Sequence, residues 1–239
     1  MTNPGFRPLY QQVRELLVQK VVSGDWGPGD ALPSEFALGQ ELGVSQGTVR
    51  KALDALASEG ILERRQGRGT FVTRHTPERS VFHFFRLRGE AGQLLTPQLV
   101  QENMIERMAT DEEAAALDLQ AGVSSVFSLE RVRKTDTSSR LLETVVINAE
   151  RVPNLHTHAP LPNAIYALYQ EHYGISILEA REELRAVAAG PDEAERLHVN
   201  VGTPLLKVVR TAVDIELKPV ELRTSLIAAS EATYAVTLR

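Results

Sequence analysis

The fold of the first part of this chain follows from the stretch Leu42-Gly43-Val44-Ser45-Gln46-Gly47-Thr48-Val49-Arg50-Lys51-Ala52-Leu53. Gly43 can end one helix because glycine accepts the left-handed conformation of a C-cap, and Ser45 can cap the next helix. Upstream, Ser34 follows Pro33 and can cap the earlier helix. The apolar residues of the second helix recur at helical spacing and should face a core, namely Val49, Ala52, Leu53 and Leu56. The stretch therefore predicts a helix-turn-helix.

The outer face of the second helix carries polar and cationic residues near its N-terminus, namely Gln46, Gly47, Arg50 and Lys51. In the DNA major groove, arginine pairs with guanine and glutamine with adenine, while lysine and backbone amides hold phosphates. The segment Glu63-Arg64-Arg65-Gln66-Gly67-Arg68-Gly69-Thr70 follows, and its glycines permit a sharp turn beneath a cluster of arginines. Such a hairpin is typical of a wing that touches the DNA backbone or the minor groove. The alternative is an ordinary helical pair with a solvated charged face, which the basic hairpin disfavours.

Residues 8–73 resemble the winged-helix domain of the GntR family of bacterial transcriptional regulators. The matching segments, in one order, are Pro8-Leu9-Tyr10, Pro28-Gly29-Asp30, Leu32-Pro33-Ser34-Glu35, Gly43-Val44-Ser45, Thr48-Val49-Arg50-Lys51-Ala52-Leu53 and Arg64-Arg65-Gln66-Gly67-Arg68-Gly69-Thr70-Phe71-Val72. The resemblance implies a DNA-binding set made of Ser34, Phe36, Ser45, Gln46, Gly47, Thr48, Arg50, Lys51, Arg65, Gly67, Arg68 and Gly69. The family commonly has arginine where this chain has Phe36, and often where it has Gln46. The family's usual operator sequence therefore does not carry over.

The composition fits two folded domains in a reducing compartment. The chain has 239 residues, 43% of them hydrophobic, and no cysteine, which excludes disulfides and thiolate metal sites. No segment is long and apolar enough to span a membrane, and residues 1–7 lack the apolar run of a signal peptide, so we expect a cytoplasmic protein with no membrane partner. The net charge is −5, yet residues 1–75 carry about +1 and the rest about −6. A winged helix needs a basic face rather than a basic chain, so this balance allows DNA binding.

The remaining pattern predicts one more helix in front and a mixed second domain behind. Residues 8–22 predict a first helix whose apolar stripe is Leu9, Val13, Leu16, Leu17 and Val21. We place the DNA-binding domain at residues 1–73, a Pro77-containing linker at 74–80 and a second domain at 81–239. There the pattern predicts strands over 81–87, 126–134, 141–149, 177–189, 205–215, 219–228 and 234–238, and helices over 110–119, 163–173 and 191–197. Antiparallel strands with helices on one side make an α+β domain.

Residues 80–239 resemble, less closely, the UTRA-type effector-binding domain of the HutC branch of that family, which shares its fold with chorismate lyase. The matching segments are Leu129-Glu130-Arg131-Val132-Arg133, Ala164-Ile165-Tyr166-Ala167-Leu168, Tyr173-Gly174-Ile175, Gly202-Thr203-Pro204-Leu205-Leu206 and Pro219-Val220-Glu221. The resemblance implies a small-molecule effector, and effector contacts at the positions of Arg131, Arg133 and Glu221.

Charged residues on the strands of the second domain indicate either structural ion pairs or an anion site. Because successive side chains of a strand point to opposite faces, Arg131 and Arg133 lie on one face of their strand, and Glu221 and Arg223 lie on one face of another strand. Buried arginines are costly unless paired, and guanidinium groups suit carboxylate or phosphate, so the residue types leave both alternatives open. The resemblance favours an effector site, which we assign to Arg86, Arg131, Arg133, Glu143 and Glu221. The Ser-Phe-Thr segment of phosphosugar-sensing relatives is not visible, and Ile227 stands where a tyrosine is expected. We therefore expect an organic acid rather than a sugar phosphate.

These features together predict a homodimeric DNA-binding transcriptional regulator, a repressor or an activator, whose pseudo-palindromic double-stranded operator is released or bound in response to an effector. Two alternatives remain: an enzyme with lyase-like chemistry in residues 80–239, and an architectural DNA binder without an effector. Glu143 and Glu221 could imitate an acid–base pair, but no nucleophile–base arrangement or phosphate loop accompanies them, so no catalytic residue is assigned. His156 and His158 are expected to be ordinary loop residues, and neither a metal nor a cofactor is expected.

Overall fold

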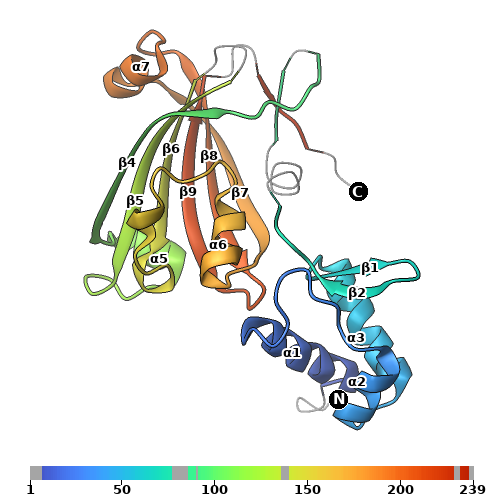
Figure 1. Ribbon diagram of the computed structural model, residues 1–239. Coiled ribbons are helices and arrows are strands. Elements are labelled where there is room, and N and C mark those ends of the chain that lie inside the picture. The colour runs from blue at the N-terminus through green and yellow to red at the C-terminus, as the bar shows by residue number, and fades with distance from the viewer. Residues whose placement is uncertain (1–6, 77–85, 90, 136–139, 229–231, 237–239) are drawn as a thin grey trace, which may run out of the picture.

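The computed structural model describes residues 7–76, 86–89, 91–135, 140–228 and 232–236. A small helical domain with a hairpin is followed by a larger domain built on a six-stranded sheet (Figure 1). The predicted class is confirmed: a winged helix-turn-helix precedes an antiparallel-sheet α+β domain. In the described part of the chain, no helix is long and apolar enough to cross a membrane.

Serine caps fix the helix-turn-helix. Helix α2 (Glu35–Leu42) begins after Ser34, whose hydroxyl accepts a hydrogen bond from the backbone amide three residues later at 3.1 Å. It ends at Gly43, which has a φ of 65°, and α3 (Gln46–Ser58) begins after Ser45, which caps that helix in the same way at 3.2 Å. Each hydroxyl satisfies an amide that has no partner within its helix, so the short link between the helices has a defined geometry.

The core of the winged helix lies between α3 and the first helix, α1 (Leu9–Val22). The four residues of α3 that were predicted to face inward are all buried. In α1 the predicted stripe is partly wrong, because Leu9 and Leu16 are 49% and 46% exposed while Val18 is buried. Helix α1 packs mainly on α3. One neighbouring helix covers a narrower part of the surface of α1 than the predicted apolar stripe occupies. The wing follows as an antiparallel hairpin of β1 (Leu62–Arg65) and β2 (Gly69–Val72).

The second domain is built on one antiparallel sheet with the strand order β4-β5-β6-β9-β8-β7. Its strands are β4 (Gln98–Met108), β5 (Ser125–Lys134), β6 (Arg140–Asn148), β7 (Ile177–Ala188), β8 (Pro204–Asp214) and β9 (Pro219–Ile227). Its helices are α5 (Asp111–Leu117), α6 (Ile165–Tyr173) and α7 (Pro191–Leu197), with two short 3-10 helices, η1 (Ala149–Arg151) and η2 (Leu155–His158). The strands and helices predicted between residues 110 and 228 therefore fall where the sequence placed them, within a few residues.

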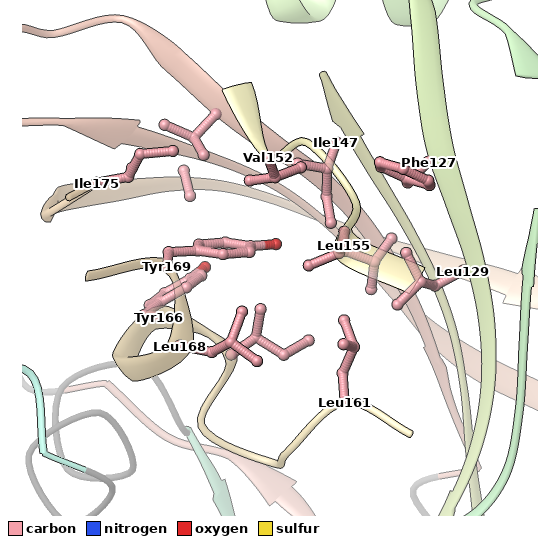
Figure 2. Close-up of a cluster of buried hydrophobic side chains, with 14 of the residues drawn as sticks. Phe127, Leu129, Ile147, Val152, Leu155, Leu161, Tyr166, Leu168, Tyr169 and Ile175 are labelled. Carbon is pink, nitrogen blue, oxygen red and sulfur yellow. The ribbon is translucent and has the colours of Figure 1, made fainter. Parts of the chain in front are cut away.

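Helices cover both faces of this sheet, so the prediction that they lie on one side is wrong. Val145 belongs to the buried cluster that includes Tyr166 and Tyr169 of α6 (Figure 2 shows this cluster), whereas its neighbour Val146 packs with α5 on the opposite face. Leu142 lies on that opposite face too, under α7. Strand β6 is apolar on both faces over most of its length, and such a strand needs cover on both. The face under α6 also carries Arg131 and Arg223, and we call it the charged face.

Strand β4 was not predicted, because its side chains do not alternate clearly between polar and apolar. It is an edge strand whose place depends on pairing with β5. A small separate sheet of β3 (Leu87–Arg88) and β10 (Thr233–Tyr234) packs on the charged face through Leu87 and Tyr234. Of the strands predicted over 81–87 and 234–238, residues 81–85 and 237–238 lie outside the described residues.

The two domains touch through an apolar contact. Ile215, between β8 and β9, and Leu178, near the start of β7, join the core cluster of the winged helix. The chain passes between the domains through residues 73–76, which have no regular structure. Residues 77–80 of the proposed linker lie outside the described residues, so the boundaries at 73 and 81 stay predictions.

Candidate DNA-binding surface and ligand cavity

Residues predicted to read DNA gather on one exposed surface of the winged helix. Gln46, Gly47 and Arg50 are exposed in the first turns of α3, and Phe36 on α2 is 62% exposed. Three further predicted residues use their hydroxyls to cap helices or to bond one another, namely Ser34, Ser45 and Thr48. The caps place the positive end of α3 and its outward side chains where a DNA groove can receive them.

Glu35, which the sequence analysis did not assign to the site, joins the donors of this surface. Its carboxylate accepts hydrogen bonds from Arg50 at 2.9 Å, from Gln46 at 3.3 Å and from Arg64 at 3.3 Å. The bond from Arg50 is the main reason that the pKa of Glu35 is lowered, with Gln46 and Arg64 contributing. Arg64 also pairs with Asp54 at 2.6 Å. One sequence signal could have identified Glu35: it is an acidic residue in the first turn of α2, next to a surface that is predicted to be cationic.

Two predicted DNA contacts are held against aromatic rings of their own domain. The Lys51 ammonium lies 4.2 Å from the centroid of the Tyr10 ring. The Arg65 guanidinium lies 4.3 Å from the Phe71 ring and donates to Glu63 at 2.7 Å. Such contacts fix where the positive charge sits, but they leave both side chains only partly covered.

The tip of the wing exposes Arg68 between two glycines. Gly67 and Gly69 have φ values of 69° and 113°, so the tight turn depends on residues without a side chain. The Arg68 side chain makes no ion pair or hydrogen bond with any residue that the structure describes. Between the wing and the start of α2 runs a groove of about 370 Å³, whose lining includes Glu35 and Arg64.

A second hollow, of about 50 Å³, lies on the charged face where the small β3–β10 sheet covers it. The polar side chains that line it are Arg86, Arg133, Glu143, Arg210, Arg223, Ser225 and Tyr234. The apolar ones are Leu87, Pro97, Leu141, Val208 and Ile227. The volume is several times what one water molecule needs, so the cavity has room for a small polar group.

Arg133 and Glu143 form the floor of this cavity as a buried ion pair. Their closest atoms are 3.0 Å apart, and Arg133 also donates to the Pro97 carbonyl at 2.7 Å and to Asn163 at 3.0 Å. Burial alone would raise the pKa of Glu143, but Arg133, Arg223 and Arg131 lower it to about 2. The carboxylate is therefore charged at neutral pH, and it binds the arginines around it.

Arg131 and Glu221, which were assigned to the same site, do not line the cavity. Arg131 pairs with Glu102 at 3.1 Å and donates to the Leu161 carbonyl at 2.8 Å. Glu221 accepts a hydrogen bond from the Tyr169 hydroxyl at 2.8 Å, and it lies 2.9 Å from Arg223. Both side chains are fully buried. The structure thus brings Arg86, Arg133 and Glu143 together and sets the other two into the surrounding packing.

Several cavity residues were not assigned from the sequence. Arg210 and Arg223 come from neighbouring strands, and Tyr234 comes from β10 and donates to Glu182, which also pairs with Arg210 at 2.5 Å. Burial by itself lowers the pKa of Arg223. The nearby carboxylates Glu221 and Glu143 raise it, and the net effect is a raised pKa. Only Arg223 had a sequence signal, its spacing of two residues from Glu221.

The histidine pair lies away from any arrangement of metal ligands. His156 and His158 belong to η2, and the His158 ring lies tilted at 46° to the His172 ring, with centroids 4.4 Å apart. In the described ranges, no group of three or more histidine, cysteine, aspartate or glutamate side chains is placed to hold a metal ion.

Family comparisons match both parts of the chain. The model for bacterial regulatory proteins of the gntR family matches residues 9–72, and the model for the UTRA domain matches residues 100–233. The winged helix with its exposed donors falls in the first match, and most of the cavity falls in the second.

Whole-chain relatives are transcriptional regulators. The sequence is 31% identical to the HTH-type transcriptional repressor NagR of Bacillus subtilis, over 85% of this chain and 84% of that protein. It is 30% identical to the histidine utilization repressor of Pseudomonas aeruginosa, over 85% and 80% of the two chains. Among solved structures, PhnF from Mycobacterium smegmatis matches with a TM-score of 0.56 and 26% identity, over 95% of this chain and 99% of that chain.

Proposed function

Since this chain belongs to the GntR family of bacterial regulatory proteins, with a UTRA domain behind its winged helix, we propose that it represses transcription as a homodimer and responds to a small organic acid. Its general function follows from the family. It is a DNA-binding transcriptional regulator whose second domain binds a small-molecule effector, not an enzyme. Acting on the bacterial chromosome, it would work in the cytoplasm.

For the DNA, we propose a pseudo-palindromic operator read by two copies of α3. One winged helix reaches only a few base pairs, so a two-fold dimer is the economical way to specify a longer site. Gln46 and Arg50 would face base edges, and Phe36 offers an apolar surface that suits a thymine methyl group. Arg68 would contact the backbone or the minor groove from the wing.

For the effector, the observation that carries the proposal is the charge of the cavity. Four arginines, Arg86, Arg133, Arg210 and Arg223, line it with one carboxylate, Glu143. Guanidinium groups bind carboxylates through paired hydrogen bonds, and the apolar lining suits a carbon skeleton beside the acid group. A small organic acid fits these features, and we assign its carboxylate to the arginine-lined part of the cavity.

The test uses the full chain and one pair of matched variants. Operator sequences are selected from random duplex DNA, the mass of the complex gives the stoichiometry, and a thermal-shift screen compares small carboxylic acids with sugar phosphates. A true effector raises the melting temperature because it binds only the native state, and it lowers operator affinity. Arg86→Gln should abolish the thermal shift, whereas Arg88→Gln, two residues along and outside the cavity lining, should retain it.

Each part of the proposal has its own contrary result. A monomer on DNA would refute the dimer, and a shift produced only by sugar phosphates would refute the organic acid. If no small molecule altered operator affinity, the architectural alternative would be correct.

A further inference from the structure

The contact between the two domains contains a clamp formed by one buried side chain, Gln170 on α6. Its amide oxygen accepts a hydrogen bond from the His75 backbone amide at 2.7 Å. Its amide nitrogen donates to the Thr73 carbonyl at 3.1 Å and to the Ser176 hydroxyl at 2.8 Å. Gln170 is 5% exposed, so these bonds are sheltered from water. One side chain of the second domain therefore holds the backbone at the exit of the winged helix.

The rest of the domain contact is loosely packed. Ile215 and Leu178 reach the core of the winged helix, but a cavity of about 140 Å³ lies beside them, lined by Val21 and Ile61 from one domain and by Ser176 from the other. A cavity of this size has room for several water molecules, so apolar side chains do not close the whole contact. The polar clamp adds directed hydrogen bonds to the apolar contact that Ile215 and Leu178 make.

The helix that carries the clamp also carries the partners of the buried acid behind the ligand cavity. Tyr169 and Tyr166 of α6 place their hydroxyls 2.8 Å and 3.4 Å from the two oxygens of Glu221. Figure 2 shows both rings side by side on this helix, with their oxygens pointing away from it. Glu221 in turn accepts a hydrogen bond from Arg223 at 2.9 Å, and Arg223 lines the cavity.

A continuous set of bonds thus runs from the cavity to the linker. An anion in the cavity attracts Arg223 away from Glu221, and a fully buried carboxylate that loses its cation must gain bonds elsewhere. Its remaining partners are the two tyrosines, so α6 is the element that has to adjust. Gln170 is the next residue after Tyr169 and shares that movement.

We propose that α6 transmits effector binding to the DNA-binding domain, with Gln170 as the positioning residue that holds the winged helix through Thr73 and His75. The proposal rests on the proposed function for its biological meaning. The coupling itself is a property of the free protein, and it is tested there without the effector.

The first experiment compares two substitutions of one kind on one helix. Tyr169→Phe removes the hydroxyl that bonds Glu221, whereas Tyr173→Phe removes a hydroxyl that hydrogen-bonds none of the described residues. Hydrogen–deuterium exchange of the full chain reports on the His75 amide, and an amide in β6 serves as the internal reference. Tyr169→Phe should speed exchange at His75 by about tenfold relative to the reference, as expected for losing one bond to a charged group. Gln170→Leu should do the same, and Tyr173→Phe should not.

Three outcomes would overturn the proposal. An unchanged His75 amide in Tyr169→Phe would show that the linker does not sense the buried acid. An equal increase in β6 would mean global destabilisation rather than transmission. A His75 amide that stays protected in Gln170→Leu would remove the clamp itself.

The second experiment asks whether the clamp matters for DNA. Tyr169→Phe and Gln170→Leu should change operator affinity several-fold in the same direction, and the double variant should change it no further, because both break one connection. Additive effects would contradict a shared path. If the wild-type chain bound no DNA at all, the proposed function would fail, while the exchange result would still decide the coupling.

Discussion

Two arginine–glutamate pairs in this molecule share their chemistry and differ in their surroundings. Arg50 and Glu35, on the proposed DNA-binding surface, lie 2.8 Å apart with side chains 58% and 18% exposed. Arg133 and Glu143, which line the proposed ligand cavity, lie 3.0 Å apart with side chains 1% and 6% exposed. In the first pair, water can take the place of Glu35 beside the exposed Arg50 guanidinium. In the second pair, each charge depends on protein groups.

The difference shows how one residue type serves two purposes. An exposed arginine can exchange a carboxylate for a phosphate or a base edge with little effect on the fold. A buried arginine can turn toward a ligand only if the carboxylate that it leaves finds another partner. We therefore expect DNA binding at the exposed pair to leave the rest of the fold unchanged. We expect a ligand in the cavity to shift the groups around it, and a regulator needs such a shift in order to respond to its effector.

Breaking the buried pair should have the largest effect on stability. Arg133→Met removes the cation that pairs with Glu143 at 3.0 Å and leaves this buried carboxylate with Arg223, 3.6 Å away, and the charge of Arg131. We expect the free energy of unfolding of the second domain to fall by about 3–5 kcal/mol, measured by urea unfolding. Replacing both Arg133 and Glu143 by Met should recover most of the loss, because no unpaired charge remains.

The matched exposed substitution for that experiment is Arg181→Met, which breaks a pair with Glu179 whose side chains are 66% and 44% exposed. It should leave the urea midpoint nearly unchanged. If Arg133→Met and Arg181→Met had the same urea midpoint, the contrast between buried and exposed pairs would not hold in this protein.

Acid should weaken the buried site selectively. The folded-state pKa of Glu143 is lowered to about 2 from an ordinary value of 4.5. A lowered folded-state pKa means that the stabilisation is complete above about pH 5 and is lost as the pH falls through the interval toward 2, with a total on the order of 3 kcal/mol. Between pH 6 and pH 3, wild type should lose more stability than Glu143→Gln, which has no proton to gain there. Equal losses would assign the acid sensitivity to other carboxylates.

The same contrast explains what the sequence could predict. The helix-turn-helix was predicted correctly because its signals are local, with Ser34, Gly43 and Ser45 all close to the helix ends that they define. Strand β4 was missed because it is a polar edge strand that is specified by its pairing with β5. The apolar run of β6 indicates that both faces of the sheet are covered by helices, but the prediction did not use this run.

The lining of the proposed ligand cavity could be predicted only in part, because distant strands contribute to it. The alternation of side chains along a strand correctly placed Arg131 and Arg133 on one face. It could not show that the segment with Leu161 covers Arg131, while Arg133 lines the cavity. Arg210 and Tyr234 reach the same cavity from β8 and β10, and no local pattern indicates that meeting.

On the exposed surface, substitution should affect DNA binding and leave folding unchanged. Arg50→Ala is expected to weaken operator binding by about tenfold or more, as is typical for one base-reading or phosphate-anchoring arginine. Its urea midpoint should stay close to that of wild type, because the Arg50 side chain is 58% exposed and Glu35 keeps its hydrogen bonds from Gln46 and Arg64. Arg181→Ala, an exposed arginine of the second domain, is the control for lost charge. Unchanged operator affinity in folded Arg50→Ala would remove Arg50 from this role.

The smallest effect is expected at the wing, where Arg68 lies at an exposed tip and forms no ion pair with the described residues. If it neutralises one phosphate, Arg68→Ala should weaken binding to many sequences alike, by several-fold, and reduce the slope of log affinity against log salt by about one. Arg68→Lys keeps the charge and should retain most of the affinity and the slope. A loss confined to one base position, or a Lys variant as weak as the Ala variant, would instead mean that Arg68 reads a base through its guanidinium group. If neither substitution changed affinity or salt dependence, the wing would not contact DNA, and recognition would rest on α3 and the start of α2.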